Sequence, residues 1–143
     1  MSAYVTQLAS LSAKHIDQLV DMYQDEWWTK GRIRSDVAAM LVGSDYVFAY
    51  EDSAGRLCAF SRVLTDGVYK AIIFDVIVRR DFRGSKLGAR IMGDICKHPA
   101  LSKIRHIELY CLPELQGFYS QFGFSNEVFG VTLMRRQLGA DSA

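Results

Sequence analysis

The most constraining feature of the sequence is an apolar run that passes directly into a basic turn containing glycine. Residues 76–88 read V-I-V-R-R-D-F-R-G-S-K-L-G, and helical spacing of apolar side chains begins at Leu87. This order predicts a buried strand, a turn and the start of a helix. Gly84 and Gly88 allow the backbone to approach a ligand closely, and a helix N-terminus offers unpaired N–H groups. The segment is therefore typical of an anion-binding loop.

Positive charge is concentrated in this loop, although the chain as a whole is balanced. The sequence has 17 Lys and Arg against 16 Asp and Glu, whereas residues 79–90 contain five basic residues and one acidic residue. The balance excludes the overall charge expected of a protein that coats nucleic acid or an anionic membrane. No apolar run in the sequence approaches the roughly 18 residues of a membrane helix. We expect no nucleic-acid or membrane partner, and a cytoplasmic location.

A length of 143 residues without a linker predicts one domain, residues 1–143. Periodicity predicts two helices, a meander of three strands, a third helix after the loop, a strand, a short helix and closing strands. These elements are expected, in that order, at residues 12–28, 35–42, 46–50, 56–65, 71–78, 87–97, 104–111, 115–122 and 124–136. Ser12 and Ser35 are the expected N-caps. The order predicts an α/β fold, specifically an α+β arrangement with a mixed sheet.

Three isolated cysteines have neither the density of a disulfide scaffold nor the paired spacing of a zinc site. We expect free thiols and no metal. Two common phosphate-binding loops are also excluded, because the sequence contains neither G-x-x-x-x-G-K-[ST] nor, in the basic turn, G-x-G-x-x-G.

Two motifs make the sequence resemble the GCN5-related N-acetyltransferase (GNAT) family. In the basic turn, Arg83 and Gly88 match the first and last positions of the family pattern [QR]-x-x-G-x-[GA], while Lys86 stands where the pattern has its middle glycine. Residues 118–124 read F-Y-S-Q-F-G-F, which is similar to the family's F-Y-x-x-x-G-F. The motifs lie about 35 residues apart in the expected order, so the resemblance covers nearly the whole chain.

The resemblance implies a mostly antiparallel sheet that is splayed between its fourth and fifth strands and flanked by about four helices. It also implies acetyl-CoA as co-substrate, with its diphosphate at the turn and its pantetheine arm along the fourth strand. The residues implied to bind it are Val76, Ile77, Val78, Arg83, Gly84, Ser85, Lys86, Leu87, Gly88 and Phe118. The expected reaction is direct transfer of an acetyl group to a primary amine of a small molecule or peptide in a ternary complex.

Acyl transfer to an amine needs a proton for the departing thiolate and a neutral amine. Tyr119 carries a phenolic proton, and the resemblance also assigns the general acid to it; a core role beside Phe118 is the alternative. Asp75 lies in an apolar strand, where burial would raise its pKa toward that of a base. Alternatively, Asp75 pairs with a basic neighbour, or holds the substrate ammonium while water takes the proton. Glu108 and His106 are rival bases.

The resemblance implies that the backbone N–H of Ile77 or Val78 stabilises the oxyanion. Cys111 is expected to be a packed thiol rather than an acyl carrier. Trp27 and Trp28, beside carboxylates at the end of the first helix, are predicted to form a wall that binds the amine. In the alternative, one tryptophan caps the core and the other lies on the surface or at a homodimer contact. A different hypothesis for the whole protein is a non-catalytic acyl-CoA or nucleotide binding module.

Overall fold

The structure is a computed structural model in which residues 4–139 are described. The chain divides into two compact units, residues 1–110 and residues 111–143. Each unit is described by itself. The single domain expected over residues 1–143 stays a prediction.

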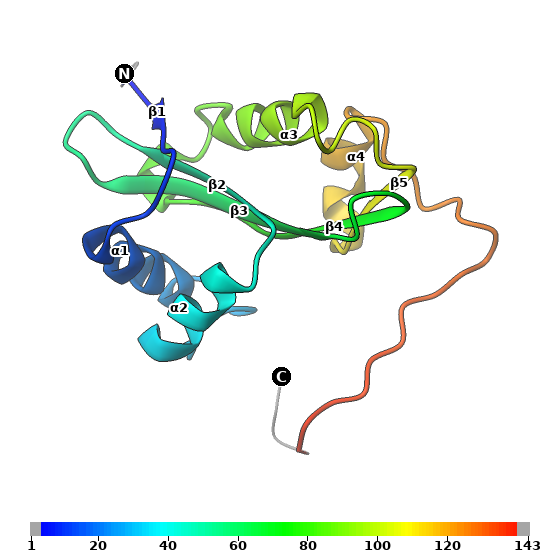
Figure 1. The fold of residues 1–143 in the computed structure, drawn as a ribbon, viewed down its shortest axis with the longest axis horizontal. Helices are drawn as coiled ribbons and strands as arrows, with labels where there is room; N and C mark the ends of the chain where they lie inside the picture. The colour runs from blue at the N-terminus through cyan, green and yellow to red at the C-terminus, as the bar shows by residue number, and fades with distance from the viewer. Residues whose placement is uncertain (1–3, 140–143) are drawn as a thin grey trace. The chain divides into compact units, whose positions relative to one another are not determined.

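The first unit is built on a five-stranded sheet with the order β1-β2-β3-β4-β5 (Figure 1). Its strands are β1 (Thr6–Gln7), β2 (Tyr46–Glu51), β3 (Leu57–Thr65), β4 (Lys70–Val78) and β5 (His106–Leu109). Strands β1 to β4 pair antiparallel, and β5 pairs parallel with β4. The mixed, mostly antiparallel sheet confirms the predicted fold class. Strand β5 is shorter than the predicted run 104–111.

The sheet opens between β4 and β5. Their pairing runs from Lys70 opposite His106 to Ile73 opposite Leu109, whereas β4 continues to Val78. Within residues 4–110, no strand pairs with this edge of β4 beyond Ile73. Because an unpaired edge exposes N–H and C=O groups, the second half of β4 offers backbone hydrogen bonds to a ligand. The predicted splay is confirmed.

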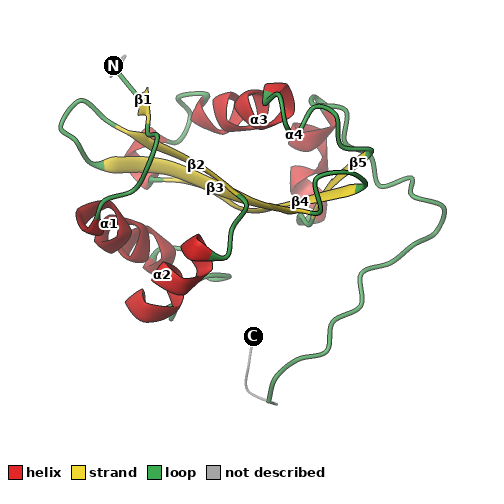
Figure 2. Ribbon diagram, viewed as in Figure 1, coloured by secondary structure: helices red, strands yellow, loops and turns green. Residues whose placement is uncertain are grey.

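Helices cover both faces of this sheet (Figure 2). Helices α1 (Ala13–Gln24) and α2 (Arg34–Val42) lie on one face, and α3 (Leu87–Lys97) lies on the other. The side chains buried between α1, α2 and the sheet are Leu19, Met22, Tyr23, Val37, Ala49, Leu57, Phe60 and Ile77. Helix α3 buries Leu87, Ile91, Met92 and Ile95. Each such side chain contributes about 1.5–3 kcal/mol when fully buried, so packing on both faces fixes the position of β4.

The two predicted N-caps have different outcomes. The Ser12 side chain accepts a hydrogen bond from the His15 N–H and caps α1, as expected. Ser35 does not cap α2. The Val37 N–H donates to the Ile33 carbonyl at 3.0 Å, so the helix already begins at residue 34 with Ile33 as its N-cap.

The second unit contains a 3₁₀ turn, Pro113–Leu115, followed by α4 (Gln116–Ser120). The predicted short helix is confirmed. The closing strands expected at 124–136 are wrong for this structure, because the described residues of that stretch form no strand. Apolar alternation favours a strand, but a strand also requires a partner, and no described strand pairs with this stretch.

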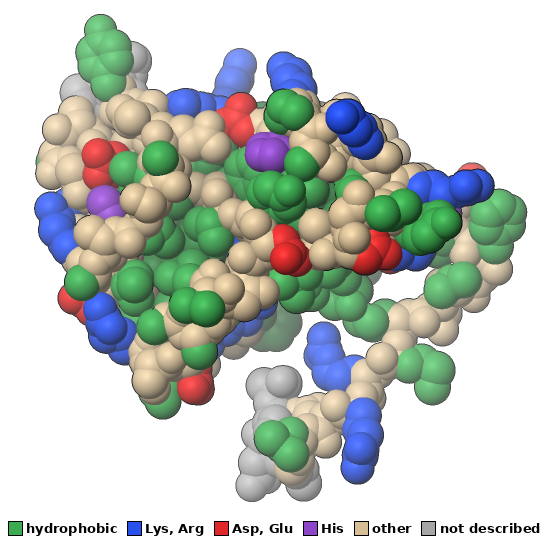
Figure 3. All heavy atoms as spheres, in the orientation of Figure 1, with side chains coloured by type: hydrophobic (Ala, Val, Ile, Leu, Met, Phe, Trp, Pro, Cys, Tyr) green, Lys and Arg blue, Asp and Glu red, His purple; other side chains and the backbone are tan. Residues whose placement is uncertain are grey.

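Within residues 4–139, no helix has the length and apolar character needed to span a bilayer. The same residues contain no cluster of three or more His, Cys, Asp or Glu side chains suited to a metal ion. Cys58, Cys96 and Cys111 are free thiols. On the face shown in Figure 3, basic and acidic side chains are interspersed, in agreement with the balanced net charge.

Candidate active site

The open part of β4 begins at a β-bulge centred on Asp75. Phe60 on β3 lies opposite Ile77, but Arg62 lies opposite Phe74, so β4 has one extra residue between these pairs. Asp75 has a φ of 57°, in the left-handed region. This conformation costs an L-residue about 1–2 kcal/mol, and aspartate tolerates it better than most. The bulge turns the Asp75 side chain toward α1.

Three donors converge on one oxygen of Asp75. Its Oδ2 accepts hydrogen bonds from Arg32 Nη1 at 2.7 Å, Arg62 Nε at 2.8 Å and Tyr23 Oη at 3.0 Å. Burial by itself disfavours the charged carboxylate, but the hydrogen bonds and charges of Arg32 and Arg62 outweigh it. The pKa of Asp75 is therefore held below its usual value.

The expectation that burial raises the pKa of Asp75 is wrong, because the sequence did not show its two arginine partners. A general base works best with a pKa near the working pH. The geometry therefore favours the alternative in which Asp75 pairs with basic neighbours, and its role as base stays a prediction that the pKa does not support. Among the rivals, the exposed Glu108 is paired with Lys70 at 2.8 Å.

The open edge of β4 carries one of the two predicted oxyanion donors. The Arg79 N–H donates to the Cys58 carbonyl at 2.8 Å. Alternation along antiparallel strands then places Ile77 in the next hydrogen-bonded pair with β3. The backbone N–H and C=O groups of Val78 point away from β3, and the Val78 carbonyl accepts a hydrogen bond from Arg83 Nε at 3.2 Å. Val78 therefore directs its N–H to the open edge, whereas the Ile77 N–H is directed to β3.

The turn before α3 presents unpaired backbone donors, as predicted. The first backbone hydrogen bond of the helix is from the Arg90 N–H to the Lys86 carbonyl. Five of the six residues 84–89 have backbone N–H groups without a partner among the described residues: Gly84, Lys86, Leu87, Gly88 and Ala89. The Ser85 N–H instead donates to the Phe82 carbonyl, as does the Ser85 hydroxyl. Five free N–H groups at the positive end of a helix dipole form an anion cradle.

The backbone conformation of Lys86 is one that glycine, the residue of the family pattern at this position, adopts readily. Lys86 is the N-cap of α3 and has φ 66° and ψ 17°, the left-handed conformation that glycine adopts without strain. The loop thus adopts at Lys86 a backbone conformation that suits glycine, at a cost in strain.

Replacing Lys86 by glycine is expected to raise the free energy of unfolding by about 0.5–1 kcal/mol, because glycine relieves this strain. Thermal denaturation measures the change. Lys86→Ala is the matched control, since it removes the charge but keeps the strained Cβ. Equal stability of the two variants would contradict the explanation.

Two basic residues of the turn region already have partners within the protein. Arg79 is held between Asp52 and Asp81, and Arg90 donates to the Val5 carbonyl. Arg79 is therefore structural.

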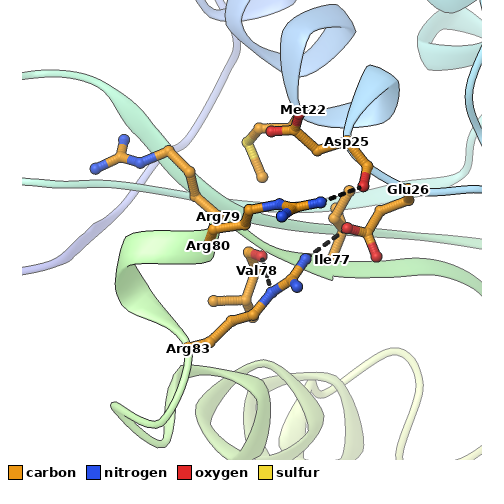
Figure 4. Close-up of a pocket in the computed structure, with 8 residues that line it drawn as sticks. All are labelled: Met22, Asp25, Glu26, Ile77, Val78, Arg79, Arg80 and Arg83. Carbon is orange, nitrogen blue, oxygen red and sulfur yellow. Dashed lines mark hydrogen bonds and ion pairs between the residues drawn. The ribbon is translucent and has the colours of Figure 1, made fainter.

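Arg83 reaches across a small pocket next to the open strand. Figure 4 shows it between the Val78 carbonyl and the Glu26 carboxylate, with Arg83 Nη2 2.5 Å from Glu26 Oε2. Met22, Asp25, Ile77 and Arg80 are among the other residues that line this pocket. The Arg83 side chain thus already donates a hydrogen bond to the Val78 carbonyl, which is one of the backbone groups of β4 expected to bind the pantetheine arm.

Glu26→Gln is expected to strengthen acetyl-CoA binding by about threefold, since it removes a partially exposed ion pair worth up to about 1 kcal/mol and frees Arg83. Isothermal titration calorimetry gives the dissociation constant. Glu127→Gln, a change at an exposed glutamate, is the control. Weaker coenzyme binding in Glu26→Gln would mean that Glu26 orders the turn rather than competing with the coenzyme for Arg83.

The two tryptophans lie in the connection between α1 and α2. Trp27 is 70% exposed and Trp28 is 39% exposed, so neither is a fully buried core residue. The buried anchor of this connection is Thr29, whose hydroxyl donates to the Tyr23 carbonyl at 2.8 Å. Binding of the amine by Trp27 and Trp28, or a homodimer contact there, stays a prediction.

In the second unit, Tyr119 lies on α4 and is buried. Its ring makes edge contacts with Phe118 and Phe124, at centroid distances of 5.0 Å and 6.4 Å. Burial, with a smaller contribution from Cys111, raises the pKa of Tyr119 to about 12. The phenol is therefore protonated at neutral pH and available as a donor. Burial likewise raises the pKa of the Cys111 thiol, which favours a packed thiol over a nucleophile.

A mixed sheet opened along one strand, with an anion cradle at the following helix, is the arrangement that the resemblance to the GNAT family implies. Residues 43–126 match the acetyltransferase (GNAT) domain family, and this match covers more than half of the chain. The chain belongs to the GNAT family and is an N-acetyltransferase. The family and activity inferred from the two motifs are confirmed, and the comparisons do not favour a non-catalytic binding module.

Known proteins similar to the chain include the uncharacterized N-acetyltransferase ycf52 of Porphyra purpurea, at 28% identity over 90% of this chain and 73% of the relative. GCN5-related N-acetyltransferase 1 of Arabidopsis thaliana is 35% identical over 57% of this chain and 43% of the relative. A crystal structure of a GNAT-family acetyltransferase from Xanthomonas campestris superposes with a TM-score of 0.81 at 28% identity, covering 94% of both chains.

Proposed function

We propose that the protein uses acetyl-CoA to acetylate a primary amine of a small molecule or peptide, by direct attack in a ternary complex. The observation that carries the proposal is the set of five free N–H groups between Gly84 and Ala89, which follows the open strand β4 after the turn at residues 79–83. The cradle suits a diphosphate. The open strand suits an amide-bearing arm, which a sheet edge binds through backbone hydrogen bonds.

In this proposal two of the three chemical roles belong to groups of this chain and the third belongs to water. The Val78 N–H stabilises the oxyanion, because it lies on the open edge. Tyr119 donates a proton or hydrogen bond to the departing thiolate, because its raised pKa keeps the phenol protonated. Water removes the proton of the attacking ammonium, because the low pKa of Asp75 makes that carboxylate a weak base. The remaining predicted coenzyme residues, including Val76 and Phe118, stay part of the proposal.

The test is thiol release from acetyl-CoA with a panel of amines, together with acetyl-CoA binding by calorimetry. Arg83→Glu is expected to weaken acetyl-CoA binding by about 10-fold or more, because it removes a charge-assisted contact and adds repulsion. Arg105→Glu, at an exposed arginine, controls for net charge. Unchanged affinity in Arg83→Glu would overturn the assignment of the loop. Acetyl-CoA binding without thiol release for any amine would favour the binding-module hypothesis.

The cytoplasmic location, the homodimer and the absence of nucleic-acid and membrane partners are further parts of the proposal, supported only by the sequence. Size-exclusion chromatography with light scattering tests the homodimer directly.

A further inference from the structure

Two arginines share one carboxylate beside the proposed reaction site. Arg32 and Arg62 both donate to Asp75 Oδ2, at 2.7 Å and 2.8 Å. No other carboxylate within residues 4–110 forms an ion pair with either arginine. Because Tyr23, the third partner, keeps its phenolic proton in these surroundings, the cluster has one uncompensated positive charge. A buried ion pair with such an excess requires either solvent or an anion.

Both guanidinium groups have N–H groups left for a ligand. Within residues 4–110, Nη1 and Nη2 of Arg62, and Nε and Nη2 of Arg32, have no hydrogen-bond partner. The Arg32 side chain is 32% exposed and the Arg62 side chain is 14% exposed. No fully buried side-chain nitrogen in the described residues lacks a partner, so the free nitrogens of Arg62 reach the surface. Such groups match the paired oxygens of a carboxylate or phosphate.

The two arginines are held in place before any ligand binds. Arg32 lies over the Tyr23 ring at 4.7 Å, and Arg62 lies over the Phe74 ring at 4.8 Å. The backbone at Arg32 is fixed as well, since Gln24 Nε2 donates to its carbonyl at 3.0 Å. Ordered arginines lose little further entropy on binding, which favours them as anion receptors over flexible surface lysines.

The cluster lies near the strand residues proposed to hold the reacting acetyl group. Asp75 and Val78 are three positions apart on β4, so about 10 Å or less separates them along the strand. Arg32 lies in the connection between α1 and α2, and Arg62 lies on β3 opposite Phe74. One small molecule can therefore place an amine at the open edge of β4 and a second group at the arginines.

We propose that Arg62 and Arg32 bind an anionic group of the acceptor, so that the substrates are small amines that also carry a carboxylate or phosphate. The inference deepens the proposed function and depends on it for the acetyl-transfer step. Asp75 is then a positioning residue, which orients both guanidinium groups without touching the acceptor.

A purely structural role for the cluster predicts a different result. A buried triad that only stabilises the fold affects all acceptors equally when it is altered. An anion receptor affects only acceptors that carry the anion. Selectivity between matched amines therefore separates the two roles.

The experiment compares 2-aminoethyl phosphate with ethanolamine, and phenylalanine with phenethylamine, in the wild-type chain and in Arg62→Lys. Thiol release gives kcat and KM for each amine, and calorimetry gives binding of each amine to the protein saturated with CoA. Arg62→Lys keeps the positive charge beside Asp75 but loses the planar guanidinium group and its paired N–H donors. Arg105→Lys is the matched control, and thermal denaturation verifies folding.

At least one anionic amine is expected to have a kcat/KM about 10-fold or more above that of its neutral partner. Arg62→Lys is expected to reduce that ratio with acetyl-CoA affinity unchanged. The phosphate and carboxylate pairs show which anion the site accepts. Neutral amines that are used equally well, or a ratio unchanged in Arg62→Lys, would overturn the inference. Binding of an anionic amine, but not its neutral partner, without thiol release would support the inference and count against acetyl transfer.

Discussion

Replacing Tyr119 by phenylalanine is expected to lower kcat by about 100-fold while leaving acetyl-CoA binding unchanged. The substitution removes one oxygen and keeps the ring, so the edge contacts with Phe118 and Phe124 remain. A core residue would tolerate this change with little loss of activity. A donor to the departing thiolate would not, because no proton or hydrogen bond then stabilises the negative charge on sulfur. Steady-state kinetics and coenzyme titration on the same samples provide the measurement.

The pH profile gives a second measure of the same role. The donor is active while protonated, and the pKa of Tyr119 is raised to about 12 by burial. For the wild-type chain we therefore expect no alkaline fall in kcat between about pH 8 and about pH 10, where an ordinary tyrosine begins to ionise. Tyr69→Phe, at an exposed tyrosine, is the control. A change of less than about twofold in kcat for Tyr119→Phe would assign Tyr119 to packing alone.

The parts of the site that are built from consecutive residues could be predicted from the sequence. Strand, basic turn and helix are contiguous between residues 76 and 97, so periodicity and glycine placement were enough to predict an anion loop. The splay between β4 and β5 depends on strands that are far apart in the chain, so only the resemblance to the family predicted it. Lys86 shows why a departure from a motif need not change the fold, since Lys86 adopts, at a cost in strain, a left-handed conformation that is open to glycine without strain.

The parts that depend on pairing between distant segments could not be predicted. The Asp75 carboxylate was noticed as unusual in an apolar strand, but its partners come from residues 43 and 13 positions away. One signal was available: Arg62 is a charge within the otherwise apolar and small run of β3, as Asp75 is within β4. Two opposite charges inside adjacent predicted strands suggest a pair. The bulge that brings them together left no sequence signal, because aspartate rather than glycine has the positive φ.

Asp75→Asn is expected to reduce the free energy of unfolding by about 3–5 kcal/mol at neutral pH, because it leaves two guanidinium groups without their counter-charge. Asparagine has nearly the same shape and tolerates the left-handed conformation at this position. The loss therefore measures the charge rather than the bulge. Thermal and chemical denaturation provide the free energy. Asp21→Asn, at an exposed position of α1 without an ion pair among the described residues, is the control.

The pH dependence of this loss follows from the direction of the Asp75 pKa, which the arginines hold below its usual value. Since the folded state binds the proton more weakly than the unfolded state, the stabilisation by Asp75 is complete above about pH 4 and is lost as the pH falls through the lower, folded-state pKa. The wild-type chain and Asp75→Asn should thus differ most at neutral pH and converge in acid. A difference that stayed constant down to about pH 2 would show that the substitution acts through packing. In that case the two arginines would not depend on Asp75 for their orientation, and the receptor they form would have to be held by Tyr23 and Phe74 alone.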